Sequence, residues 1–189
     1  MHKTLLGVLA LLCVGSGLAH GQVLLVNTAD PSAVTFTGTG SFASADYAVT
    51  GTTAFPIRLA SFFTTDQTNF DSLASSTTLM TTGAGHTLGR AFLRVGAGGP
   101  TTLLLRQDGN SQELFSTGSA AFTGSATYDL SSVASALPGS GASGNIYAAD
   151  NTTLIGTYLI TAIPEPATYG VAAGLFCLGF VALRKRSRS

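Results

Sequence analysis

The chain of 189 residues lacks tryptophan, and its two cysteines, Cys13 and Cys177, both lie in apolar segments near its ends. The region between those segments therefore contains no disulfide and no cysteine-based metal site. Charged residues are scarce as well, at 10% of the chain, whereas 45% of the residues are hydrophobic. Disordered chains combine low hydrophobicity with high net charge, and the formal net charge here is zero. We therefore expect a folded body.

Positive charge is particularly scarce in the middle of the chain. Residues 22–163 carry four arginines against eight carboxylates, a net charge of −4, whereas residues 164–189 carry a net charge of +3. A protein that binds nucleic acid needs a basic face for the phosphates. The acidic balance of the body therefore predicts no nucleic-acid partner.

Histidine is nearly absent too, since His86 is the only one after residue 21. Transition-metal sites rely on clustered nitrogen and sulfur ligands, and the chain has no GxSxG motif to mark a nucleophilic serine. A GxGxxA pattern at Gly38–Ala43 is followed by strand-like and turn-like sequence. The dinucleotide motif needs a helix at that point, so we interpret the pattern as a glycine-rich turn. We expect no cofactor, no metal and no enzymatic activity.

Two sets of carboxylates leave alternatives open. Residues 108–113 (DGNSQE) place oxygen ligands at alternating positions, loosely like the start of a calcium loop, although a hairpin turn is favoured there. Glycoside hydrolysis needs two carboxylates at a set separation in space. The candidates for such a pair are Asp66, Asp71, Asp108 and Glu113.

Arginine alternates with other residues in one segment. Arg90, Phe92 and Arg94 would share one face of a strand, with Ala91 and Leu93 on the other. A solvated strand face is the favoured interpretation, and a stripe that binds an acidic polymer is the alternative.

The pattern of residues 22–162 predicts an all-β domain, with a β-sandwich or jelly-roll-like architecture. Short apolar or β-branched runs, such as QVLLVN at 22–27 and TTLLLRQ at 101–107, alternate with glycine-rich turns. Residues 71–80 (DSLASSTTLM) are the best candidate for a short helix. The last two runs suggest a hairpin with Asp150 and Asn151 at its bend.

The first 21 residues have the layout of a secretory signal peptide. Lys3 supplies a positive charge, an apolar core runs from residue 5 to residue 14, and small residues precede two candidate cuts, after Ala19 or after Gly21. An N-terminal membrane anchor is the alternative. A lipoprotein signal at Cys13 is rejected, because the bulky Leu12 precedes it.

The other end of the chain carries an unusual junction. Pro164, Glu165 and Pro166 precede an uncharged run at 167–183, and a basic tail follows immediately. The 17 residues of that run reach about 26 Å as a helix, near the lower limit for crossing a bilayer. Prolines cannot continue a strand or lie inside a helix, so they hold Glu165 in a stiff, extended spacer. The tail predicts a cytoplasmic C terminus; its cations are Arg184, Lys185, Arg186 and Arg188.

This order of motif, apolar helix and arginine-rich end resembles the PEP-CTERM sorting signal of Gram-negative bacteria. The resemblance covers residues 163–189 only. It implies recognition by exosortase, a membrane-embedded processing enzyme, and an association with the cell surface, exopolysaccharide and biofilm. It also implies that the body is frequently glycosylated, and Asn151 in the sequon Asn-Thr-Thr is a candidate acceptor.

The expected organisation has three parts. They are a signal peptide (1–21), a β-rich extracytoplasmic domain (22–162) and a sorting signal (163–189), which divides into a motif (164–166), a transmembrane helix (167–183) and a basic tail (184–189). The function expected is that of an exported, non-catalytic surface or matrix protein; the alternative is a carbohydrate-binding or adhesive module. The expected partners are the secretion machinery, the cytoplasmic membrane, an exosortase-type enzyme and extracellular polysaccharide.

Overall fold

The computed structural model describes residues 21–49, 57–81, 87–93, 99–107 and 113–161. Strands make up most of the regular structure within these ranges. They are β1 (Gln22–Asn27), β2 (Val34–Gly38), β3 (Tyr47–Val49), β4 (Ile57–Leu59), β5 (Phe70–Thr77), β6 (Met80–Thr81), β7 (Arg90–Leu93), β8 (Leu103–Arg106), β9 (Glu113–Phe115), β10 (Phe122–Thr123), β11 (Ser125–Tyr128), β12 (Ser143–Tyr147) and β13 (Leu154–Thr161). Two short 3-10 helices, η1 (Pro31–Ala33) and η2 (Ser131–Ala136), complete the described elements.

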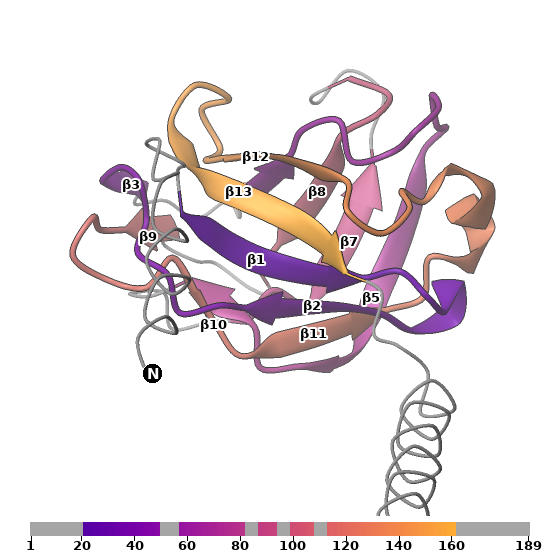
Figure 1. Ribbon diagram of the computed structural model, residues 1–189, viewed down its shortest axis with the longest axis horizontal. Coiled ribbons are helices and arrows are strands. Elements are labelled where there is room, and N and C mark those ends of the chain that lie inside the picture. Colours follow the sequence, from indigo (N-terminus) through magenta and orange to yellow (C-terminus); the bar gives the residue numbers. More distant parts are fainter. Residues whose placement is uncertain (1–20, 50–56, 82–86, 94–98, 108–112, 162–189) are drawn as a thin grey trace, which may run out of the picture.

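Nine of these strands form one closed barrel, in the order β1-β13-β12-β4-β8-β7-β5-β11-β2 (Figure 1). Every neighbouring pair is antiparallel except β1 with β13, which are parallel. Two small sheets, β3-β9 and β6-β10, lie outside the barrel order. The all-β prediction is therefore confirmed.

The barrel differs from the expected sandwich or jelly roll in how its sheet ends. The first strand, β1, pairs with both the last strand, β13, and with β2, so the sheet closes on itself. Closure leaves no unpaired edge strand in the barrel. Sandwiches and small barrels share the same alternation of inward apolar and outward polar residues. The sequence pattern therefore predicted strands without distinguishing these two ways of arranging them.

Apolar side chains fill the barrel. Alternate residues of the strands point inward, such as Ile57 and Leu59 on β4, which are almost fully buried. Aromatic rings pack at the centre, where Phe36 lies 6.0 Å from Phe62 between ring centroids. The hydroxyl of the buried Tyr158 donates a hydrogen bond to the Ala60 carbonyl at 3.0 Å. The interior is thus a packed core.

The prediction of a short helix at residues 71–80 is wrong, because this segment forms most of β5 and the start of β6. Strand β5 pairs with β7 on one side and β11 on the other. Those partners satisfy its backbone hydrogen bonds, and its exposure alternates between half-buried and exposed along Phe70–Leu73. Tertiary pairing thus outweighs the weak local preference for helix.

The ends of the described barrel lie close to the expected domain boundaries. Strand β1 begins at Gln22, and β13 ends at Thr161, two residues before Ile163. Within the described ranges, no helix is long and apolar enough to cross a membrane. The transmembrane helix predicted at 167–183 and most of the predicted signal peptide lie outside those ranges.

Candidate functional site

Three arginines lie on neighbouring strands, on the outer surface of the barrel. Arg58 on β4, Arg106 on β8 and Arg90 on β7 belong to three strands that are neighbours in the sheet. Their strand neighbours Ile57, Leu59, Ala91 and Leu105 belong to the core, so the arginines point outward. We call these arginines, with Phe92 and Leu104 between them, the arginine face.

The strand register sets the order of side chains on this face. Arg106 is directly opposite Arg90, and Leu104 is directly opposite Phe92 on the same two strands. Leu104 is also paired with Arg58 on its other side. The arginine face therefore contains one apolar pair, Phe92 and Leu104. Arg58 lies beside this pair on β4. Arg90 and Arg106 form the next pair on the same face of β7 and β8.

The apolar pair is buried although it lies on the outside of the barrel. Leu104 is 1% exposed and Phe92 is 8% exposed, yet neither belongs to the main core cluster. The guanidinium carbon of Arg106 lies 5.9 Å from the centroid of the Phe92 ring. Such a cation–π contact helps to hold the Arg106 head group flat against the barrel.

The charges on the arginine face are only partly balanced. Arg90 Nη1 donates to Asp71 Oδ2 at 2.9 Å, but Arg106 has no carboxylate partner within the described residues. The Nε atoms of Arg90 and Arg106 are both buried and have no hydrogen-bond acceptor in the described part of the chain. Like charges directly opposite each other on a sheet are destabilising. The site therefore carries surplus positive charge.

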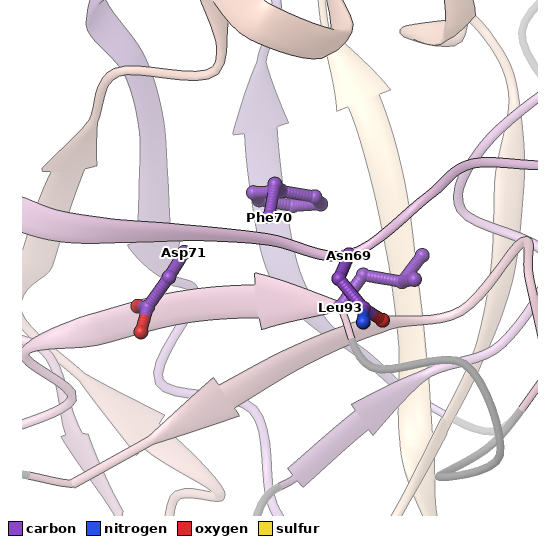
Figure 2. Close-up of a pocket in the computed structure, with 4 residues that line it drawn as sticks. All are labelled: Asn69, Phe70, Asp71 and Leu93. Carbon is purple, nitrogen blue, oxygen red and sulfur yellow. The ribbon is translucent and has the colours of Figure 1, made fainter.

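A pocket of 380 Å³ adjoins this face where β5 begins and β7 ends (Figure 2). It is lined by Asn69, Phe70, Asp71 and Leu93. Phe70 and Asp71 extend to opposite sides of β5, as successive residues of a strand do. Phe70 contacts the core, while Asp71 reaches Arg90. Asp71 thus lines the pocket and also pairs with Arg90 of the arginine face.

A second pocket of 290 Å³ lies near the end of β13, at the opposite end of that strand from the hairpin bend. Its lining includes Thr28, Pro31, Leu137 and Thr161. Aliphatic, proline and hydroxyl groups dominate this lining, and none of its described residues is charged. It offers no acid, base or nucleophile of unusual reactivity.

The predicted glycan acceptor lies in an exposed turn. Strands β12 and β13 form a hairpin with its bend at the expected place, but its first strand is β12 and not the predicted run at 120–130, whose strand β11 pairs with β2 and β5 instead. Asn151 lies at the bend with a positive φ of 66°. The Asp150 carboxylate accepts hydrogen bonds from Thr152 N at 3.0 Å and Thr153 N at 2.9 Å. These bonds order the turn and leave Asn151 at the surface.

Several other predicted site residues lie outside the described ranges. The sorting motif and basic tail are among them: Pro164, Glu165, Pro166, Arg184, Lys185, Arg186 and Arg188. So are His86, Arg94 and residues 108–112 of the calcium-like segment.

The remaining motifs are placed by the structure. Gly38 ends β2 and the residues that follow it are not helical, so the glycine-rich turn is confirmed. Of the carboxylates considered for hydrolysis, Asp71 is paired with Arg90, whereas Glu113 begins β9 in a separate small sheet. Among the described residues there is no group of three or more histidine, cysteine or acidic side chains suited to a metal.

The arginine face was only partly visible in the sequence. Alternation predicted that Arg90 and Phe92 share a strand face, and β7 confirms this with Ala91 and Leu93 in the core. It did not show that Arg106 and Arg58 join them, because that depends on the order β4-β8-β7. The available signal was that every basic residue of the body is an arginine in or beside an apolar run.

Comparison of the chain with known protein families, characterised proteins and solved structures finds no match.

Proposed function

We propose that this protein is an exported, non-catalytic component of the cell surface or extracellular matrix, sorted and processed through its PEP-CTERM-like C-terminal signal. The observation that carries the proposal is the order of the C-terminal segment: Pro-Glu-Pro, an uncharged run of 17 residues and a basic tail. The N-terminal segment, with one lysine and an apolar core, supplies the matching export signal.

The position of the barrel along the chain supports processing at both ends. All the described strands lie between Gln22 and Thr161. Cleavage after Ala19 or Gly21, and again near Pro164, would leave all of these strands in place. The mature product would keep β1 paired with β13 and hence a closed barrel.

Four carboxylates of the body are unsuited to act as general acids at neutral pH. Hydrogen bonds from serine and threonine lower the pKa of Asp30, Asp46, Asp129 and Asp150. A general acid at neutral pH needs a raised pKa instead. These four side chains fix turns and loop ends, as the Asp30 carboxylate does when it accepts from Ser32 N at 2.9 Å.

Intact-mass analysis of protein purified from its native host tests the proposal. We expect a main species that lacks both the N-terminal signal and the basic tail. A matched preparation from a host without the sorting enzyme should retain the tail. If the main native species still contains a peptide that spans Glu165 to Arg188, the processing proposal is wrong.

The same spectra test for glycan. We expect added mass on the mature chain, on serine and threonine hydroxyls or on Asn151, which is exposed. Digestion by a protease would then assign the modified peptide. A native mass equal to that of the bare mature polypeptide would contradict glycosylation.

A carbohydrate-binding or adhesive module is the second candidate. The specific observation that favours it is the arginine face, which gathers three of the body's four basic residues on adjacent strands. Both functions use the same export route.

A further inference from the structure

We propose that the arginine face binds an acidic polysaccharide and that its guanidinium groups contact the carboxylate groups of the polymer. The surface concerned is the outer side of β4, β8 and β7, with Arg58, Arg106 and Arg90 as its cations. The inference goes beyond the proposed sorting function and is tested on purified protein, so either can fail without the other.

The argument starts from the opposition of Arg106 and Arg90 across neighbouring strands. Side chains directly opposite on an antiparallel pair lie about 5 Å apart at their β-carbons. Asp71 neutralises part of the charge of Arg90, while Arg106 is held on Phe92 without a carboxylate partner in the described residues. A bound carboxylate would offset this repulsion.

The donors left for a ligand are the terminal nitrogens of the guanidinium groups. The Nε atoms of Arg90 and Arg106 are covered, whereas the Arg90 side chain as a whole is 32% exposed. Guanidinium groups bind carboxylates through pairs of parallel hydrogen bonds. With neighbouring strands about 4.8 Å apart, the row of Arg106, Arg90 and Leu73 extends roughly 10 Å across β8, β7 and β5, which suits a repeating acidic chain better than a single ion.

An apolar contact lies beside the cations. Leu73 on β5 is directly opposite Arg90 and is 63% exposed, although it is a large hydrophobic residue. Arg106, Arg90 and Leu73 thus form a continuous row across β8, β7 and β5. A sugar ring that carries a carboxylate has both groups this row can bind: an anion for the arginines and an apolar C–H face for Leu73.

Nucleic acid fits this surface less well. Single-stranded nucleic acid binds by stacking bases on exposed aromatic rings along a basic groove. Phe92 is only 8% exposed and lies under Arg106.

The test measures binding of the purified full chain to polygalacturonate, with dextran as the uncharged polymer and oligothymidylate as the nucleic acid. The key variant is the double substitution Arg90→Gln with Arg106→Gln. Its matched control is Arg186→Gln with Arg188→Gln, which removes the same charge from the tail. We expect wild type and the tail variant to bind polygalacturonate alike and the face variant to bind at least about tenfold more weakly, because charge-assisted bidentate bonds are lost.

Several outcomes would overturn the proposal. These are no binding by wild type, equal binding by the face variant, an equal loss in the tail variant, or tighter binding to oligothymidylate or dextran. If the glutamine variant unfolds, Arg90→Lys with Arg106→Lys keeps both charges and long side chains. That variant should bind more weakly than wild type because lysine cannot bind a carboxylate in a bidentate manner, and undiminished binding would again overturn the proposal.

Discussion

Gly144 and Tyr158 lie directly opposite each other on β12 and β13, and the aromatic ring occupies the space above the glycine. A methyl group on Gly144 would lie 2.5 Å from the Tyr158 hydroxyl oxygen and 2.7 Å from the Ala60 carbonyl oxygen. The hydroxyl is bonded to that same carbonyl, and burial raises the pKa of Tyr158 to about 12. The glycine therefore allows the tyrosine to reach its acceptor across the strand pair.

Gly144→Ala should consequently destabilise the barrel. Overpacking of a core usually costs about 1–3 kcal/mol, and loss of the tyrosine hydrogen bond adds about 1 kcal/mol. Urea unfolding should show a total loss of about 2–4 kcal/mol. The control is Gly139→Ala, where the added methyl would have no neighbour within 4 Å. Equal midpoints for the two variants would contradict the steric argument.

A double-mutant cycle should detect repulsion between Arg90 and Arg106. Each is replaced by glutamine, alone and together, and the free energy of unfolding is measured at low and at high salt. We expect an unfavourable coupling of about 0.2–1 kcal/mol at low salt, and screening should reduce it at high salt. In an Asp71→Asn background the coupling should grow, because the carboxylate that pairs with Arg90 is gone. A favourable or salt-independent coupling would show that the two charges do not repel.

Acid should destabilise the barrel through its turn carboxylates. Burial alone would raise the pKa of Asp150, but hydrogen bonds from Thr153 and Thr152 outweigh it and lower the pKa from 3.8 to about 2. A group with a lowered pKa in the folded state stabilises the fold above its unfolded pKa, and this stabilisation is lost as pH falls through the folded value. The free energy of unfolding should therefore be level from about pH 8 to pH 5 and fall between about pH 4 and pH 2.

The variant Asp150→Asn measures how much this one carboxylate contributes to the free energy of unfolding and to its fall in acid. Because the group is exposed to solvent, its contribution is at most about 1 kcal/mol after screening. The variant should lose about this much at neutral pH and should show a shallower fall in acid. Asp66→Asn is the control, since the Asp66 carboxylate accepts no hydrogen bond from the described residues. An unchanged acid profile in Asp150→Asn would contradict the assignment.

Local sequence predicted some strands well and missed others for physical reasons. The run predicted at 22–27 has the same bounds as strand β1, because it is a continuous run of strand-forming apolar residues. The segment that forms β12, SGNIY, begins with serine, glycine and asparagine, which are typical of turns. It is a strand because β13 and β4 both pair with it and because Gly144 must face Tyr158. Strand β4 is distant in sequence, so no local pattern reveals that pairing.

The candidate site shows the same limit. Alternation along one strand predicts which residues share its face, as it did for Arg90 and Phe92. Whether two strands are neighbours, and in which register, depends on how the whole sheet closes. Arg106 reaches Arg90 only because β8 follows β7 in the barrel order and pairs with it antiparallel. A site made from three strands therefore becomes visible only with the fold.

Glu165 and the basic tail should have separate roles in sorting. Each tail cation resists entry into the bilayer by about 2.5–3.5 kcal/mol at mid-membrane on insertion scales. On the proposed topology four such cations would share the task of stopping transfer, so Arg184→Ala alone should leave export and sorting nearly unchanged. On the proposed topology Glu165 lies on the other side of the membrane, where it cannot assist that stop.

A recognition contact is the role that fits Glu165, because Pro164 and Pro166 fix the backbone on both sides of it. Glu165→Gln keeps the size of the side chain and removes its charge. In a host that carries the sorting enzyme, we expect this variant to insert normally and to accumulate unprocessed in the cytoplasmic membrane, whereas Arg184→Ala is processed like wild type. Pulse-labelling with immunoblotting of membrane and extracellular fractions measures both. Processing of Glu165→Gln at the wild-type rate would show that the enzyme does not read this carboxylate.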